Sequence, residues 1–259
     1  MIWRDLLKTK VTPATHDRRG ANAARGTKRE KPEHGTSLLT AFQEIRELIV
    51  HGRMSPGTWI VEADLADRLN MSRTPVRAAI HWLQREGYVL EQRGTSKSRM
   101  IVAPLTKEDA NELYLIIGRL EGIAGRGAIA RPAAEREKLA DELQKINKRL
   151  LSIANGSGVA TEIFELDRTF HRAIVNAGAG SRLSTLHQAI EPQAERYWRL
   201  YASSIIKDLH ISVTEHAQII DALRKGDADA IEDGLQKNWL KGAERLGHVI
   251  DMFGERGSW

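Results

Sequence analysis

The stretch ADLADRLNMSRTPVRAAIHWLQREG, residues 63–87, decides the fold of this chain. It predicts two short helices joined by a tight turn, one around Glu62 to Leu69 and a second that begins at Arg73. Ser72 occupies the N-cap position of the second helix, where its hydroxyl can accept a hydrogen bond from a backbone N–H of the first turn. Pro75 falls within that turn, where a missing backbone donor is harmless. We therefore expect the second helix to start directly after Ser72.

The second helix is predicted to have one apolar side and one basic side. At about 100° per residue, Val76, Ala79, Ile80 and Leu83 share one side, and Thr74, Arg77 and His81 share the other. Arg73 stands at the exposed N-terminal tip, and Leu65 and Leu69 of the preceding helix supply packing. Such a helix suits end-on insertion into the major groove of DNA, where arginine can bond guanine bidentately. An amphipathic surface helix with solvated arginines has the same periodicity.

The sequence around this helix separates the two interpretations. Residues 49–89, IVHGRMSPGTWIVEADLADRLNMSRTPVRAAIHWLQREGYV, resemble the winged helix-turn-helix of the GntR family of bacterial transcription regulators. Members carry a similar I-x-x-G-x-x-x-P-G motif, an LA pair and an SRTPVR-like run. The resemblance implies that Ser72, Arg73, Thr74 and Arg77 face DNA.

The positive charge of the chain is concentrated at its beginning. The 259 residues carry a net charge of +5. Residues 1–35 hold nine Lys and Arg against four Asp and Glu, residues 36–105 hold nine against seven, and the remainder holds 21 against 23. This asymmetry is expected of a phosphate-binding end joined to a neutral ligand-binding end, because lysine and arginine release counterions from the duplex.

Composition also excludes several kinds of protein. No cysteine is present, so disulfides, thiolate metal sites and cysteine nucleophiles are ruled out. No window offers the apolar run that a membrane span needs, and the first residues, MIWRDLLKTK, lack the apolar core of a secretory signal. We expect a cytoplasmic protein without a membrane partner.

Four segments are predicted along the chain. Residues 1–35 have no sustained periodicity and are expected to form a flexible basic arm that either gives DNA binding modest electrostatic help or is inert. Residues 36–105 are expected to form the winged helix-turn-helix, with a first helix from Ser37 to His51. Residues 106–252 form an all-helical effector-binding and dimerisation domain, and residues 253–259 form a tail.

A β-hairpin wing is expected after the second short helix. Its strands are predicted at Tyr88 to Glu91 and at Met100 to Ala103. The loop between them, QRGTSKSR, offers DNA-contact candidates to phosphates or to the adjacent minor groove: Arg93, Gly94, Lys97 and Arg99. The family places a glycine shortly before the second wing strand, whereas Arg99 holds roughly that place here and Gly94 comes earlier.

Only helices are predicted after the wing. Their expected ranges are 106–130, 133–154, 159–177, 181–207, 211–225 and 227–252, separated by turns at Pro132, Gly156, Gly178, Asp208 and Gly226. Six antiparallel helices form a bundle, so the fold class is mainly α: three helices with a wing, then an all-α bundle.

A polar constellation is predicted inside this bundle. Asp167 and His171 are four residues apart on one helix, so they share a face. His216 opens another helix and Asn238 lies in a third. Such convergence is one way in which bundles build a divalent-metal site, although an Asp-x-x-x-His pair alone is more often a surface ion pair.

The segments DRTFHRAIVNAGAGSRL and EHAQIIDALRKGDADAI resemble the FCD ligand-binding domain of the FadR subfamily of GntR regulators. The resemblance implies a zinc or nickel site at Asp167, His171 and His216, with Asn238 replacing the usual fourth histidine. Because an amide oxygen is a weaker ligand than imidazole, either a loosened metal is held with water and an effector carboxylate, or the polar groups bind the effector directly. Arg119 matches the arginine at the start of the family's ligand pocket, and its planar fork suits a carboxylate.

The function implied is a homodimeric, metabolite-responsive transcription repressor. It would bind a pseudo-palindromic double-stranded operator and be released by a small carboxylate held in the helical domain, with Arg119 and Asn238 as effector-binding candidates. One alternative is a metal-dependent hydrolase using Asp167, His171 and His216, but no H-E-x-x-H motif supplies a base. A nucleoid-type DNA binder without a ligand is a second alternative.

Overall fold

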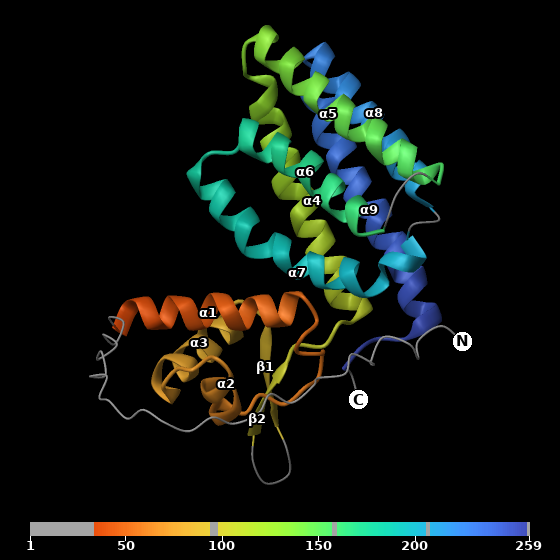
Figure 1. Ribbon diagram of the computed structural model, residues 1–259. Helices are drawn as coiled ribbons and strands as arrows, with labels where there is room; N and C mark the ends of the chain where they lie inside the picture. The colour runs from red at the N-terminus through yellow and green to blue at the C-terminus, as the bar shows by residue number, and fades with distance from the viewer. Residues whose placement is uncertain (1–33, 94–97, 157–159, 206–207, 258–259) are drawn as a thin grey trace, which may run out of the picture. The chain divides into compact units, whose positions relative to one another are not determined.

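The computed structural model describes residues 34–93, 98–156, 160–205 and 208–257 (Figure 1). Its first part contains α1 (His34–Val50), α2 (Glu62–Arg68), α3 (Arg73–Arg85), β1 (Val89–Arg93) and β2 (Ser98–Val102). Its second part contains α4 (Lys107–Ile129), α5 (Ala133–Ala154), α6 (Ala160–Gly178), α7 (Ser181–Ile205), α8 (Leu209–Lys225) and α9 (Ala228–Phe253). The predicted fold class, three helices with a wing followed by a six-helix bundle, is confirmed.

The apolar side of α3 is the centre of the first part. Val76, Ala79, Ile80 and Leu83 are all buried, as the periodicity predicted. They pack with residues of α1 and with Leu65 of α2, while Leu69 is partly buried against the same cluster. The tight turn between α2 and α3 uses Asn70 with a φ of 52°, in the left-handed region that asparagine tolerates. This packing holds the opposite side of α3 at the surface.

The predicted capping bond of α3 is absent from the structure. Ser72 occupies the N-cap with an extended backbone, but its side chain makes no capping hydrogen bond. Pro75 is compatible with the start of the helix because its ring fixes a helical φ and the backbone N–H that it lacks would have no partner in the first turn. The hydroxyl of Ser72 therefore does not serve the helix.

The wing is longer than the sequence predicted. The strands pair antiparallel from Val89↔Val102 to Arg93↔Ser98, so Arg93 and Arg99 lie in strands and not in the loop. Gly94 and Lys97 fall outside the described residues. A third short extended segment lines β2 on its other edge, through a bridge between Trp59 and Ile101.

The bundle is organised around α4, which packs along α9 and contacts α6 and α7, while α5 lies beside α8 (Figure 1). The approach of α4 to α6 is close enough to require glycine. A Cβ atom added at Gly178 would lie 1.8 Å from the carbonyl oxygen of Ala124. In the described parts of the chain, no helix is both long and apolar enough to cross a membrane.

Candidate functional sites

The exposed side of α3 presents the residues predicted to face DNA. A shallow hollow is lined by Arg73, Thr74, Arg77, Ala78 and His81. Within the described residues, the exposed guanidinium of Arg73 forms no ion pair. Arg73 is therefore available to an external anion or base edge.

Arg77 differs from Arg73 because Glu62 of α2 already holds its guanidinium. Nε of Arg77 donates to both carboxylate oxygens of Glu62, at 2.9 and 3.0 Å, and Nη2 lies 2.8 Å from Oε2. The hydrogen bonds and the charge of Glu62 raise the pKa of Arg77. The side chain remains 62% exposed. Part of the guanidinium of Arg77 is therefore engaged within the protein, although the side chain faces solvent, and its contact with DNA stays a prediction.

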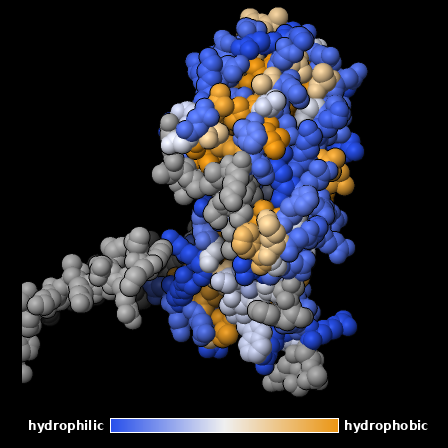
Figure 2. Space-filling view, turned by 90° about the vertical axis from the view of Figure 1, so that its right-hand side faces the viewer, coloured by the Kyte–Doolittle hydropathy of each residue, from blue (hydrophilic) through white to orange (hydrophobic). Residues whose placement is uncertain are grey.

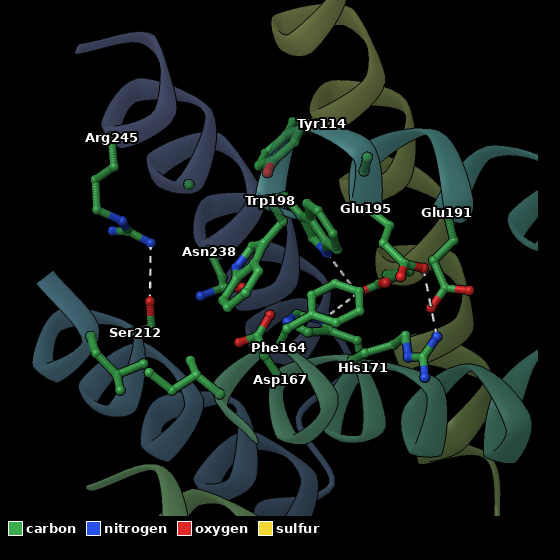
Figure 3. Close-up of a pocket in the computed structure, with 17 residues that line it drawn as sticks. Tyr114, Phe164, Asp167, His171, Glu191, Glu195, Trp198, Ser212, Asn238 and Arg245 are labelled. Carbon is green, nitrogen blue, oxygen red and sulfur yellow. Dashed lines mark hydrogen bonds and ion pairs between the residues drawn. The ribbon is translucent and has the colours of Figure 1, made fainter. Parts of the chain in front are cut away.

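A cavity opens in the bundle between α4, α6, α7, α8 and α9 (Figure 3). Two aromatic pairs form much of its wall. Tyr114 and Trp239 meet edge to face with ring centres 5.1 Å apart, and Phe164 and Trp198 are tilted with ring centres 4.9 Å apart. Other lining residues are Glu121, Ile163, Asp167, Arg168, His171, Glu191, Ala194, Glu195, Leu209, Ser212, Asn238, Gly242 and Arg245. The cavity combines aromatic and aliphatic walls with polar and charged groups, as small-molecule sites do.

The structure brings together the three predicted metal ligands. Asp167, His171 and His216 each place one ligand atom so that all three atoms lie within 4.8 Å of one another. His216 is completely buried and stacks on Phe170, with ring centres 3.9 Å apart. Neither nitrogen of His216 has a hydrogen-bond partner among the described residues. Nε2 of His216 lies 3.5 Å from Oδ1 of Asp167 without a hydrogen bond. Because buried polar atoms normally have hydrogen-bond partners, this imidazole fits a site for a divalent cation.

Glu121 is the functional residue that the sequence interpretation missed. Its buried carboxylate accepts hydrogen bonds from His171 Nδ1 at 2.5 Å, His187 Nε2 at 3.0 Å and Trp239 Nε1 at 2.7 Å. The bond to Nδ1 leaves Nε2 of His171 for a metal, which is the usual arrangement of a carboxylate behind a ligating histidine. A signal was present, because Glu121 interrupts the buried apolar stripe of α4 that includes Ile117.

Burial and these contacts shift the pKa values of the cluster. Burial alone would raise the pKa of Glu121, but His171 and His187 outweigh it and lower the pKa to about 2. Burial would lower the pKa of His171, but the charge of Glu121 raises it to about 9. Burial raises the pKa of Asp167, and burial together with the charge of His171 lowers the pKa of His216. Glu121 and His171 therefore form a buried charged pair beside a neutral His216.

Asn238 and Arg119 occupy different environments. Asn238 lines the cavity and is buried, and its amide nitrogen donates to Glu215 at 2.8 Å. Arg119 is exposed, donates to Gln236 on α9, and is not among the residues that line the cavity. The expected place of Arg119 in the pocket is therefore corrected, because its position on α4 faces outward. Arg245 is a cavity arginine instead, with Nη2 3.2 Å from the hydroxyl of Ser212.

Two families match the chain over both parts. Residues 39–96 match the bacterial regulatory proteins of the gntR family, and residues 112–238 match the FCD domain. The chain belongs to the GntR family of transcription regulators, in the FadR subfamily. The family consists of DNA-binding regulators and not of enzymes, so the hydrolase alternative is set aside.

Curated relatives agree with this membership over most of the chain. The probable D-xylose utilization operon transcriptional repressor of Paenarthrobacter nicotinovorans is 31% identical over 76% of this chain and 84% of its own length. The gluconate operon transcriptional repressor of Bacillus subtilis is 26% identical over 81% of this chain and 91% of its own length. Among solved structures, E. coli McbR/YncC shares the fold, with a TM-score of 0.61, 18% identity, and coverage of 84% of this chain and 99% of that one.

Proposed function

We propose that this regulator is a metabolite-responsive repressor that binds a pseudo-palindromic operator as a homodimer and is released by a small carboxylate. The observation that carries the proposal is the separation of two sites: unpaired Arg73 on the exposed side of α3, and the buried cluster of Asp167, His171 and His216 in the bundle. The named relatives that repress operons support repression. Each site is built for a different ligand.

DNA readout is assigned to the start of α3. Arg73, Thr74 and the hydroxyl of Ser72, which the helix does not use as a cap, are directed to base edges and phosphates of the major groove. Arg77 is prepositioned by Glu62 and contacts DNA with the part of its guanidinium that remains available. Arg93 and Arg99 of the wing strands, with Gly94 and Lys97, contact the neighbouring backbone.

A divalent metal, zinc or nickel, is assigned to the cluster in the bundle. Asp167, Nε2 of His171 and His216 would hold it, with Glu121 orienting the ring of His171. The metal would supply a Lewis-acidic anchor for a carboxylate. Asn238 is close enough to line the same cavity, but its amide nitrogen is committed to Glu215. Its amide oxygen and its second amide N–H remain for an effector, and three protein ligands would leave open positions on the metal for water and an effector.

The effector carboxylate is assigned to Arg245 in place of Arg119. Arg245 is mostly buried and lines the cavity with Ser212 (Figure 3). Its contacts to Glu215 are long, 3.4 Å from each of two nitrogens, and Lys241 shares the same carboxylate at 3.4 Å. Because these contacts are long, the guanidinium of Arg245 keeps N–H groups for an anionic ligand group.

Helix α7 is the proposed connection between the cavity and α3. Glu195 and Trp198 of α7 line the cavity. On other faces of the same helix, Gln193 donates to the backbone oxygen of Glu86, the C-cap residue of α3, at 2.7 Å, and Arg196 donates to that of Ala103 at 2.5 Å. A ligand that shifts α7 therefore changes contacts at the end of the DNA-reading helix.

Homodimerisation is proposed through the bundle. Hydrophobic patches interrupt its mostly hydrophilic surface in Figure 2. Leu115 and Ile123 of α4 are both more than half exposed and lie eight residues apart, two turns along one side of the helix. A dimer would give two DNA-reading heads for the two halves of an operator.

Two measurements test this proposal together. Selection from a pool of random duplexes should return a sequence with two related half-sites, and small carboxylic acids should be screened by thermal shift with zinc or with chelator. A ligand that binds only the native protein raises its melting temperature. An acid that stabilises the protein should also weaken binding of the selected duplex, and the duplex should weaken acid binding by the same factor. The absence of any selected sequence would refute the proposal.

A further inference from the structure

An exposed tryptophan stands beside the wing with an arginine stacked upon it. Trp59 is 56% exposed and lies three residues before the start of α2. Cζ of Arg99 lies 3.5 Å from the centre of the Trp59 ring. That distance is stacking contact between the guanidinium plane and the indole face, which fixes the position of an otherwise flexible side chain.

The backbone around this pair is firmly held. Residues 58–60 add a third strand to the wing, since Ile60 N donates to Met100 O at 2.8 Å and Val102 N donates to Thr58 O at 2.9 Å. Trp59 stands opposite Ile101, and Arg99 is the diagonal neighbour two residues along β2 on the same face. The sheet therefore determines the stacked geometry.

The surroundings of the pair are basic. Trp59 borders a shallow hollow that is also lined by Arg53 and Arg68, with Asp64 as its acid. Among the described residues, Arg53, Arg68 and Arg99 take part in no ion pair. In the part of the chain that the structure describes, this positive charge is therefore not paired with an acid, and it adjoins both the wing and α2, whose Glu62 holds Arg77 of α3.

We propose that the Trp59–Arg99 stack is a second DNA-contact surface, in which Trp59 positions Arg99 against a backbone phosphate of the duplex. The inference rests on the proposed function, which already places Arg99 at the DNA backbone, and adds Trp59 as the residue that positions it. A stacked guanidinium keeps its edge N–H groups free to donate to phosphate oxygens, while the indole face excludes alternative rotamers. Trp59 is thus a positioning residue whose effect acts through Arg99.

The experiment measures the affinity of the full chain for a 30-bp random-sequence duplex at several salt concentrations. Loss of one phosphate contact lowers the slope of log K against log salt by about 0.9. We expect Arg99→Ala to lower the slope by this amount, and Trp59→Ala to produce at least half of the same loss. Trp59→Phe keeps a ring beneath the guanidinium and should retain most of the wild-type slope. The double variant should behave as Arg99→Ala alone.

Controls separate this role from simple stability or charge. Leu186→Ala removes an apolar side chain of similar exposure from α7, and Arg149→Ala removes an arginine from α5; neither should change the slope. Thermal unfolding without DNA shows whether each variant is folded. A normal slope for Arg99→Ala, a normal slope for Trp59→Ala, or additive losses in the double variant would each overturn the inference. Failure of the wild-type protein to bind any duplex would overturn the proposed function as well.

Discussion

The winged helix-turn-helix, from α1 to β2, and the helical bundle differ in how their charged side chains are paired. On α3 and the wing, Arg73 and Arg99 stand exposed without an acidic partner among the described residues. In the bundle, Glu121 is fully buried and satisfied by His171, His187 and Trp239. An unpaired surface charge can attract an oppositely charged ligand, whereas a buried charge must be paired within the fold because it is not solvated. Substitutions in the first region should therefore change mainly DNA binding, and substitutions of the buried charges in the bundle should change mainly stability.

The carboxylates of Glu62 and Glu121 show this contrast in one residue type. Glu62 pairs with Arg77 at the surface, where water and salt screen the interaction. Glu121 pairs with His171 in the interior, where an orphaned partner cannot be solvated. Removal of Glu62 should change DNA binding more than stability, and removal of Glu121 should do the reverse.

The largest expected effect is that of Glu121→Ala. The substitution strands the buried, charged His171, so we expect a loss of about 3–5 kcal/mol in the free energy of unfolding. Urea denaturation measures it, and Glu162→Ala, which removes the exposed partner of Arg149, is the surface control that should leave stability unchanged. A similar decrease in the free energy of unfolding for the two variants would contradict the proposed difference between buried and exposed carboxylates.

The next effect concerns the metal. At zinc concentrations about 100-fold above the dissociation constant, binding should stabilise the wild-type protein by about 2.7 kcal/mol. His216→Gln should abolish this zinc-dependent rise in melting temperature, while His210→Gln, at an exposed position on the same helix, should keep it. An undiminished rise in the His216 variant would mean that zinc binds elsewhere.

The pH dependence of zinc binding follows from the buried pair. The pKa of His171 is raised to about 9, so its ring is protonated at neutral pH and must lose that proton to ligate a metal. Affinity should therefore rise by about tenfold per pH unit between pH 6 and 8. In the metal-free protein, the stability from this pair is present below the ordinary histidine pKa and is lost as pH rises through 9. Glu121→Gln, where it folds, should flatten the zinc profile, and a flat wild-type profile in calorimetric titrations would contradict the assignment.

The smallest effect tests the connection between the regions. Gln193→Ala removes the α7 hydrogen bond to the backbone of Glu86. It should reduce the factor by which a bound acid weakens DNA binding by about two- to tenfold, without changing the affinity for either ligand alone. Fluorescence anisotropy with and without acid measures the factor, and Gln144→Ala on α5 is the control. Full coupling in Gln193→Ala would exclude this route.

The positions of the helices could be predicted from the sequence because apolar periodicity and Pro or Gly residues at the breaks are local features. The apolar periodicity of Val76, Ala79, Ile80 and Leu83 fixed the buried side of α3, and Pro132, Gly178 and Gly226 marked breaks between bundle helices. The i, i+4 spacing of Asp167 and His171, with the family resemblance, was enough to bring His216 to the same cluster.

Features that depend on tertiary contacts were missed or misplaced. Glu121 reaches His171 and His187 from a different helix, and no local spacing encodes that meeting. Arg119 was placed in the pocket by resemblance, but it lies on the exposed side of α4, where it donates to Gln236. The engagement of Arg77 by Glu62 likewise spans two helices, so the sequence showed the arginine without its partner.

The central claim is that side chains at the exposed start of α3 read the DNA sequence, whereas the metal binds at a separate site in the bundle. The direct test compares wild type and Arg73→Ala for binding to a duplex selected by the wild-type protein and to a random duplex at the same salt concentration. The account predicts at least a 1000-fold preference in the wild type, a loss of about tenfold or more of that preference in Arg73→Ala, and unchanged zinc binding in both. An undiminished preference in Arg73→Ala, or a parallel loss of zinc binding, would contradict it.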